Sequence, residues 1–425
     1  MPEPKIQLLL TGNEIMSGDT VDSNSAVIGQ RLAELDLTIY RKVTVGDDID
    51  LLQAELADMS QNADLVIING GLGPTVDDLT AEVLAAVAGV PITEHPQAIA
   101  HLQDWCGKRR LPLNAANLKQ AQLPEGCTII DNPSGSAVGF ALKLNDCQVI
   151  CTPGVPSELK AMLDQIVDQL SQQLHRSTST TILRLQTFGL GESNAQQLIA
   201  DYIPNWPADV DLGFRAGAPQ MEIKLTTRSE EALQASQHCL AQIHELFGDH
   251  IIGEGNSQLA VRVLELLQQR GQTLTVAESC TGGLIASMLT RVPGASDSFK
   301  AGFVTYSNHM KETLLGVNRE LLAEQGAVSE EVVVQMAAGA LARAEADYAV
   351  AVSGIAGPDG GTPEKPVGTV WMAWGDKHQL QTRRLRWPFG RAMFQTMTAA
   401  SCLDMIRRTL LGIETEPRYF SQRRA

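Results

Sequence analysis

The segment 277–283, AESCTGG, gathers two hydroxyls, a thiol, a carboxylate and two glycines in one short stretch. An apolar stretch precedes it and a helical pattern follows, so it is expected to form the turn between a strand and a helix. Backbone N–H groups at such a helix start can bind a phosphate or stabilise an oxyanion. The stretch equally fits a capped helix in which Ser279 or Thr281 is only the N-cap, and by itself it leaves both interpretations open.

Two further segments supply the partners that amide hydrolysis requires. The stretch 303–311 ends an expected strand with Tyr306 and places Lys311 just beyond it, and 353–361 ends another strand in a glycine-rich loop. Ligands bind beyond the carboxyl ends of strands in an open parallel sheet, so these segments are expected to converge. A serine needs a base, and a lysine whose pKa is lowered by burial can be that base. Tyr306 would relay the proton or hold the lysine, and the backbone amides of residues 281–283 would receive the oxyanion.

A second set of candidate residues lies in the first part of the chain. The segment 70–80, GGLGPTVDDLT, places adjacent carboxylates after a glycine-rich turn, and Glu14 and Asp47 lie at other expected strand ends. Carboxylates suit a hard divalent cation, which in turn suits pyrophosphate chemistry. The alternative, in which each acid only caps a helix, stays open, above all for Glu14.

Strands alternate with helices at both ends of the chain, which predicts two parallel-sheet α/β domains joined by a small α+β module. The first domain is expected over 1–174. The connecting module follows over 175–254, beginning with a polar linker to residue 181. The second domain is expected over 255–412, and the polar, basic tail 413–425 is expected to be mobile.

The composition narrows the function classes. A formal net charge of −16 disfavours nucleic-acid binding, which needs clustered Lys and Arg. No apolar run approaches the roughly 20 residues that span a bilayer, and no signal peptide is evident, so we expect a soluble cytoplasmic protein without a membrane partner. The seven cysteines are scattered, which favours reduced core cysteines over a zinc site.

The segments AESCTGG, GFVTYSN, GAVSEEVVVQMAAGA, SGIAGPDGG and KPVGTVW, spread over about residues 257–410, resemble the C-terminal domain of the competence/damage-inducible CinA family. That domain is known as a nicotinamide mononucleotide deamidase, which makes nicotinic acid mononucleotide and ammonia without a cofactor. The resemblance implies Ser279 as the nucleophile, with Tyr306 and Lys311 as its catalytic partners. The substrate-binding residues that it implies are Thr281, Gly282, Gly283, Ser353, Gly354 and Arg391. Members often carry a second arginine after the one matching Arg391, where this chain has Gln395.

The segments TGNEIMSGDTVDSNS and GGLGPTVDDLTAE resemble the molybdopterin-binding fold of molybdenum cofactor biosynthesis. The resemblance implies Gly71 and Gly73 as substrate-binding residues, Asp78 as the functional acid and Asp47 as its partner. Glu14, from its place at an expected strand end, is the third candidate metal ligand beside Asp47 and Asp78. The segments NPSGSAVG and CTPGVPSEL match the CinA version of this domain, which implies an ADP-ribose pyrophosphatase that needs a divalent metal cation. The family expectation for the assembly is a homodimer.

Two other functions remain open. In the first, the N-terminal domain transfers or adenylylates molybdopterin and the C-terminal domain only regulates it. The density of chemical groups in AESCTGG argues against a purely regulatory domain. In the second, the chain is a DNA-uptake or repair accessory, against which the acidic balance argues.

Overall fold

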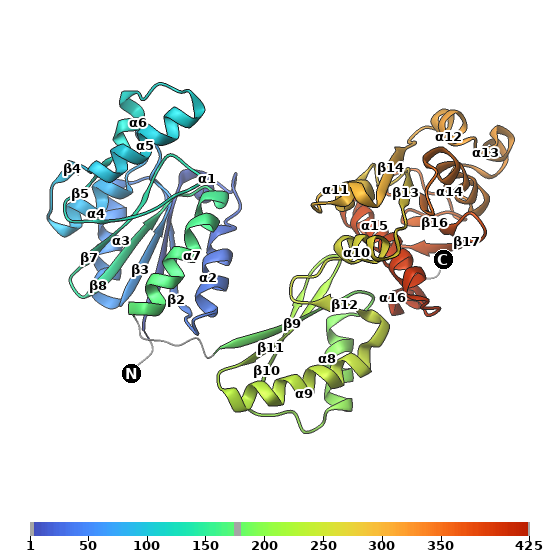
Figure 1. Ribbon diagram of the computed structural model, residues 1–425, viewed down its shortest axis with the longest axis horizontal. Helices are drawn as coiled ribbons and strands as arrows, with labels where there is room; N and C mark the ends of the chain where they lie inside the picture. The colour runs from blue at the N-terminus through green and yellow to red at the C-terminus, as the bar shows by residue number, and fades with distance from the viewer. Residues whose placement is uncertain (1–3, 174–179, 424–425) are drawn as a thin grey trace. The chain divides into compact units, whose positions relative to one another are not determined.

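The computed structural model describes residues 4–173 and 180–423, and the chain divides into two compact units at Thr181. Both units are α/β, as the sequence predicts (Figure 1). Residues 174–179, which hold most of the predicted linker, lie outside the described residues. No helix among the described residues is both long and apolar enough to cross a membrane.

The first unit is built on a six-stranded sheet in the order β2-β1-β3-β8-β7-β6. The strands are β1 (Ile6–Thr11), β2 (Ile39–Val45), β3 (Leu65–Asn69), β6 (Thr128–Ile130), β7 (Gly139–Leu144) and β8 (Cys147–Thr152). The first four in the sheet order are parallel, whereas β7 and β6 are antiparallel to their neighbours. Only two residues join β7 to β8, and Asn145 there has a φ of 57°. A link that short makes a hairpin, because a parallel neighbour needs a long crossover.

Helices cover both faces of this sheet (Figure 1). Leu8 and Leu10 of β1 pack with α2 (Asn24–Ala33) and α7 (Pro156–Gln173) on one face, while Leu9 packs with α3 (Ile49–Asn62) and α4 (Thr80–Ala88) on the other. This two-sided burial is why the strand reads as a continuous apolar run. The remaining elements are α1 (Asn13–Met16), β4 (Ile92–Glu94), α5 (Pro96–Arg109), α6 (Ala115–Lys119) and β5 (Gln122–Pro124).

The second unit begins with the small α+β module. Its elements follow in the order β9 (Thr181–Thr187), α8 (Glu192–Tyr202), β10 (Asp211–Ala216), β11 (Met221–Thr227), α9 (Glu230–Phe247), the short 3₁₀ helix η1 (Gly248–His250) and β12 (Ile251–Glu254). The sheet order β10-β11-β9-β12, with a βαββαβ chain order, is the split βαβ arrangement. Apolar residues of α8 and α9 form one core with the strands.

The rest of the second unit surrounds a five-stranded sheet in the order β14-β13-β15-β16-β17. The strands are β13 (Leu274–Glu278), β14 (Phe299–Val304), β15 (Tyr348–Gly354), β16 (Thr369–Asp376) and β17 (Leu380–Arg386). β13 is parallel to β14 and β15, whereas β16 and β17 are antiparallel. The three residues after Asp376 turn the chain straight back into β17, which again excludes a parallel crossover.

Two groups of helices enclose this sheet. One face packs against α10 (Leu259–Arg270), α11 (Leu284–Thr290) and α15 (Arg391–Leu411), and the other against α12 (Asn308–Leu315), α13 (Arg319–Gln325) and α14 (Glu330–Ala344). A second 3₁₀ helix, η2 (Ala295–Asp297), precedes β14. The two apolar faces bury β13 completely and β15 except for its two end residues, which fixes where their carboxyl ends lie.

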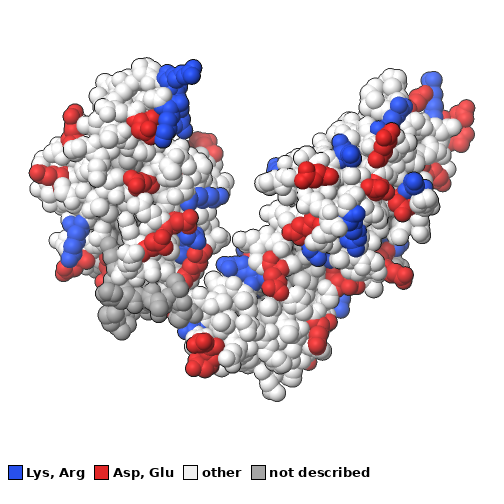
Figure 2. All heavy atoms as spheres, in the orientation of Figure 1, with Lys and Arg blue, Asp and Glu red and all other residues white. Residues whose placement is uncertain are grey.

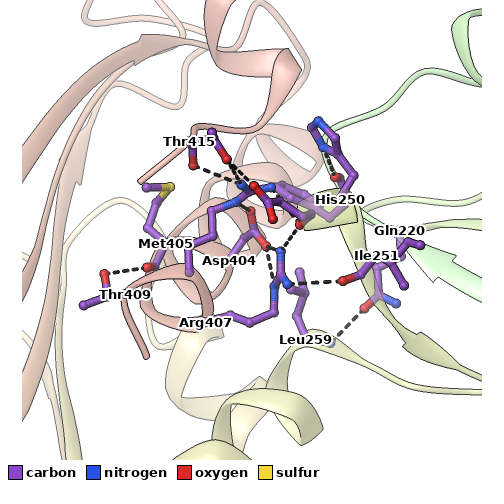
Figure 3. Close-up of polar contacts among 12 residues, drawn as sticks. Gln220, His250, Ile251, Leu259, Asp404, Met405, Arg407, Thr409 and Thr415 are labelled. Carbon is purple, nitrogen blue, oxygen red and sulfur yellow. Dashed lines mark hydrogen bonds and ion pairs between the residues drawn. The ribbon is translucent and has the colours of Figure 1, made fainter. Parts of the chain in front are cut away.

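A buried ionic cluster joins the α+β module to α15 (Figure 3). Asp404 accepts hydrogen bonds from the Nε atoms of Arg407 and Arg408 at 2.8 and 2.7 Å. Both guanidinium groups then donate to the carbonyl oxygen of Asp249 in η1, at 2.6 and 3.0 Å. Asp404, Arg407 and Arg408 are each at most 1% exposed, so their partners must come from the protein. The module and the C-terminal sheet therefore belong to one unit.

The described residues after 412, up to 423, include a helix that packs against the fold, so the expectation of a mobile tail is not met there. Residues 418–422 form α16 (Arg418–Gln422), in which Phe420 is fully buried. The Tyr419 hydroxyl donates to the carbonyl oxygen of Leu190 at 2.5 Å, and its ring packs edge-on against Phe188. The aromatic residues of the segment find partners on the module, which its polar and basic composition concealed.

Charged side chains of both signs are mixed over the face drawn in Figure 2. A group of basic side chains lies over α5 and α6, where the last turn of α5 carries Lys108 and Arg109. The Arg109 guanidinium lies 4.3 Å from the centre of the Trp105 ring, so part of this charge stacks on its own helix.

Candidate active sites

The AESCTGG segment forms the expected turn between a strand and a helix. β13 ends at Glu278 and α11 begins at Leu284. Gly282 and Gly283 have φ values of 64° and 96°, a conformation that residues with a Cβ rarely adopt. The Ser279 backbone N–H donates to the carbonyl oxygen of Val352 on β15, at 3.0 Å, which ties the turn to the neighbouring strand.

Ser279 and Lys311 meet in the interior of the domain. The Lys311 Nζ lies 3.0 Å from the Ser279 Oγ. It also lies 2.8 Å from the carbonyl oxygen of Thr305 and 3.3 Å from that of Tyr306. Lys311 is 1% exposed, and burial lowers its pKa below the ordinary value of 10.5. Burial therefore makes the Lys311 amine easier to deprotonate than that of a lysine in water.

The two carbonyl groups decide what a neutral Lys311 does. A neutral amine keeps two N–H bonds and one lone pair. If the N–H bonds point at the oxygens of Thr305 and Tyr306, the lone pair faces the hydroxyl of Ser279. The Thr305 carbonyl is itself fixed, because its backbone N–H donates to the carbonyl oxygen of Glu278 at 2.9 Å. The arrangement matches a serine with a lysine as its general base.

The expectation that residues 281–283 offer their amides to an oxyanion needs correction. Glu278 is fully buried, and its carboxylate accepts from the backbone N–H groups of Gly283, Ile285 and Ala286 at 3.1, 3.1 and 2.8 Å. Gly282 donates to the carbonyl oxygen of Ser279. Within the described part of the chain, the N–H groups of Cys280 and Thr281 make no hydrogen bond, so of the amides in this turn these two remain available to a substrate oxygen.

Tyr306 and Arg391 stand together at the surface of the site. The Tyr306 side chain is 62% exposed and accepts from the Arg391 Nη2 at 3.0 Å, while the Arg391 Nη1 donates to the carbonyl oxygen of Gly357. The predicted contact between the Tyr306 hydroxyl and the lysine is therefore wrong. Only the backbone carbonyl of Tyr306 reaches Lys311, because the side chain points to Arg391.

The remaining predicted residues lie around the same turn. Ser353 is buried near the end of β15, whose residue Val352 pairs with Glu278. At Gly354 a Cβ would lie 2.8 Å from the carbonyl oxygen of Thr369, so only glycine fits. Cys280 is buried, and burial raises the pKa of its thiol to about 12. His309, the histidine of the 303–311 stretch, is exposed on α12.

The first unit contains a cavity of about 590 Å³ at the carboxyl ends of its parallel strands. All five residues predicted for this site line it, namely Glu14, Asp47, Gly71, Gly73 and Asp78. At Gly73 a Cβ would lie 2.5 Å from the Asp78 Oδ2, so the glycine lets the carboxylate close over the turn. The sequence therefore identified the residues around this cavity.

The acids of this cavity do not gather as metal ligands. The two oxygens of Asp47 accept from the Thr11 hydroxyl at 2.9 Å and the Asn13 backbone N–H at 3.0 Å. The Asp78 Oδ2 accepts from the backbone N–H and hydroxyl of Thr75 at 2.8 and 2.6 Å. Among residues 4–173 and 180–423 no group of three or more acidic, histidine or cysteine side chains is placed to hold a metal ion. The expected coordination shell of Glu14, Asp47 and Asp78 is therefore not preformed, and Asp47 and Asp78 each already accept two hydrogen bonds from nearby backbone N–H and hydroxyl groups.

Several residues that shape the two sites were not predicted from the sequence. Gln395 on α15 donates to the carbonyl oxygen of Cys280 at 2.8 Å and so braces the serine turn. Lys119 on α6 donates to the carbonyl oxygens of Thr75 and Asp78 and holds the acidic turn. The only signal for Glu278 was an acid at the end of an apolar strand, directly before the glycine-rich turn.

Comparison with known families divides the chain into three parts. The family model described as the CinA C-terminal domain matches residues 256–410, and the one described as the damage-inducible protein CinA KH domain matches 184–253. The model described as a probable molybdopterin binding domain matches residues 7–172.

Two similar proteins match over nearly the whole chain, and a solved structure matches about a third of it. A CinA-like protein from Colwellia psychrerythraea is 51% identical over 100% of this chain and 99% of its own length. A CinA-like protein from Shewanella frigidimarina is 39% identical over 96% of both chains. The crystal structure of a competence/damage inducible protein from Agrobacterium tumefaciens is 43% identical over 36% of this chain and 93% of its own, with a TM-score of 0.35.

Proposed function

This chain belongs to the CinA family, and we propose that its C-terminal domain hydrolyses nicotinamide mononucleotide to nicotinic acid mononucleotide and ammonia. One observation carries the proposal: the buried amine of Lys311 lies 3.0 Å from the Ser279 Oγ, with two carbonyl groups on its other side. The nucleotide substrate rests on the family resemblance, and the amide chemistry rests on this pair of residues.

In the proposed reaction Ser279 attacks the carboxamide carbon while Lys311 takes the hydroxyl proton. The carbonyl oxygen becomes an oxyanion next to the N–H groups of Cys280 and Thr281. Lys311 then passes its proton to the amide nitrogen, and the C–N bond breaks. Ammonia departs, and the acyl group stays bound to Ser279. A water molecule gives its proton to Lys311 and attacks the acyl carbon. The proton returns to the Ser279 oxygen, and the acid product leaves.

Arg391 gives the site a positive charge for the phosphate of the substrate. It is exposed at the start of α15, and its guanidinium is fixed by the Tyr306 hydroxyl and the carbonyl oxygen of Gly357. A phosphate oxygen has a higher negative charge than either acceptor, so it can replace the Tyr306 contact and gain a charge-assisted bond. Arg391 would therefore orient the nucleotide while Ser279 and Lys311 act on its amide.

The test is ammonia release from nicotinamide mononucleotide by the purified full chain in the presence of a chelator. We expect activity with the chelator present, a loss of about 10³-fold or more in kcat for Ser279→Ala, and a loss within about tenfold for the adjacent Cys280→Ala. An Arg391→Gln variant should raise KM more than it lowers kcat. Undiminished ammonia release by folded Ser279→Ala, or a requirement for metal, would refute the proposal.

A second activity is favoured by the cavity of about 590 Å³ in the first unit. We propose that the first unit cleaves the pyrophosphate bond of ADP-ribose in this cavity. The glycine-rich turn around Gly71 and Gly73 brings backbone close to bound phosphates, and Asp47 and Asp78 each keep lone pairs beyond those used in the turn. Since the acids do not form a closed cage, a divalent cation would take part of its ligands from the phosphates, as Mg²⁺ commonly does.

The pyrophosphatase proposal is tested by product analysis with ADP-ribose and added Mg²⁺. Asp78→Asn should abolish cleavage and leave ammonia release from nicotinamide mononucleotide intact, whereas the matched change Asp104→Asn on exposed α5 should affect neither. Cleavage by folded Asp78→Asn at the rate of the unchanged protein would return Asp78 to a purely structural role at the turn.

A further inference from the structure

A second cavity, also of about 590 Å³, lies in the C-terminal domain at the end of the sheet opposite to Ser279. Tyr348 at the start of β15, Asp376 at the end of the antiparallel β16 and Leu380 at the start of β17 line it. Ser279 and Gly354 stand at the other ends of β13 and β15. A strand of seven residues spans roughly 20 Å, so the two sites are separate.

One part of the wall of this cavity is apolar and partly aromatic. The last turns of α14 contribute Leu341 and Ala342, and Tyr348 contributes a half-buried ring from the sheet. A flat organic group can bury against these three side chains, because aromatic and aliphatic surface of this kind gains from being removed from water. The volume of about 590 Å³ lies within the range of pockets that hold small organic ligands.

The charges around the cavity decide which ligand fits. Three carboxylates line it, from Glu345, Asp347 and Asp376, against one lysine, Lys377, and the exposed His378. The C-terminal end of α14 adds partial negative charge of the same sign. The backbone N–H groups of Gln379 and His378 lower the pKa of Asp376, so this carboxylate stays ionised at neutral pH.

We propose that this cavity binds an organic monocation with a flat apolar body, at a site distinct from both proposed active sites. The cation would lie among Glu345, Asp347 and Asp376, and the flat body would pack on Leu341, Ala342 and the Tyr348 ring. Tyr348 adds attraction for the cation through its ring face. An anion of the same shape would meet the three carboxylates and be rejected.

The site also has a direct structural connection to the catalytic lysine. Gly339 of α14 lies so close to α12 that a Cβ there would come within 2.0 Å of the carbonyl oxygen of Leu315. Leu315 lies one turn of α12 beyond Lys311.

The test uses three probes of one shape and different charge, namely 4-fluorobenzylammonium, 4-fluorobenzyl alcohol and 4-fluorobenzoate, with binding to the full chain followed by ¹⁹F NMR. We expect the ammonium to bind with a Kd on the order of 1 mM, as its size allows, and more tightly than the alcohol, with no binding of the benzoate. Asp376→Asn should weaken ammonium binding about two- to fivefold, and the exposed control Glu324→Gln should not change it.

Two variants locate the bound probe. Ala342→Trp fills the cavity from an exposed position on α14 and should abolish ammonium binding without unfolding the domain. Ser279→Ala should leave ammonium binding unchanged. Equal binding of all three probes, no binding of the ammonium, or loss in Ser279→Ala with retention in folded Ala342→Trp would overturn the proposal.

Discussion

Replacing Lys311 by methionine removes the proposed base while keeping an unbranched side chain in the same buried space. A positioned general base contributes typically 10²–10⁴-fold, so we expect kcat to fall by about 10³-fold, equivalent to about 4 kcal/mol. The carbonyl groups of Thr305 and Tyr306 lose a donor, which costs about 1–3 kcal/mol for each group left unsatisfied. Removing a buried amine offsets part of that cost, so we expect the variant to fold.

The assay is ammonia release over a range of pH, with thermal unfolding as the control for folding. Burial lowers the pKa of Lys311, so the neutral amine accumulates as pH rises through a value below 10.5. The kcat/KM of the unchanged protein should rise with pH over that range, because only the neutral amine accepts the serine proton. The residual activity of Lys311→Met should lose this rise. Folded Lys311→Met with activity within tenfold of the unchanged protein, and with the same pH profile, would refute the reasoning.

Three further predictions concern other buried groups. Cys280→Ala should keep most of the activity and iodoacetamide should not inactivate the protein, because burial raises the thiol pKa to about 12 and keeps it protonated at neutral pH; rapid inactivation would contradict this. Glu278→Gln should lower the free energy of unfolding by about 1–3 kcal/mol, since one backbone N–H of α11 then faces an amide N–H; an unchanged denaturation midpoint would argue against it. Asp404→Ala leaves two buried guanidinium groups without their carboxylate and should cost about 3–5 kcal/mol in urea unfolding, whereas a loss below 1 kcal/mol would mean that the carbonyl groups alone suffice.

The positions of the candidate residues followed from the sequence wherever a strand ended in a motif. Buried strands read as continuous apolar runs, and their carboxyl ends fixed the places of Ser279, Ser353 and Asp78. Lys311 was predictable for the same reason, since it lies in the first turn of the helix after β14. The direction of the strands at the sheet edges was harder to predict from the sequence. A two-residue hairpin such as that after Leu144 depends on the turn residues and not on the apolar pattern.

The contacts of individual polar groups could not be read from the sequence. Glu278 takes the amides that were assigned to the oxyanion, because a fully buried carboxylate must find donors. The Tyr306 hydroxyl turns to Arg391, which lies 85 residues away along the chain. The Asp404 cluster includes the Asp249 carbonyl group from a different part of the fold, so no local sequence pattern predicts it.

The proposed acyl group on Ser279 is the most direct test of the account. Full-length protein at steady state with nicotinamide mononucleotide is quenched in acid and digested, and the active-site peptide is sequenced by mass spectrometry, while hydroxylamine is added to a parallel reaction. We predict that the nicotinic acid mononucleotide acyl group is found on Ser279 and is absent from Ser279→Ala, and that hydroxylamine diverts part of the product to the hydroxamate. An adduct on Cys280, or ammonia release with neither adduct nor hydroxamate, would contradict the account.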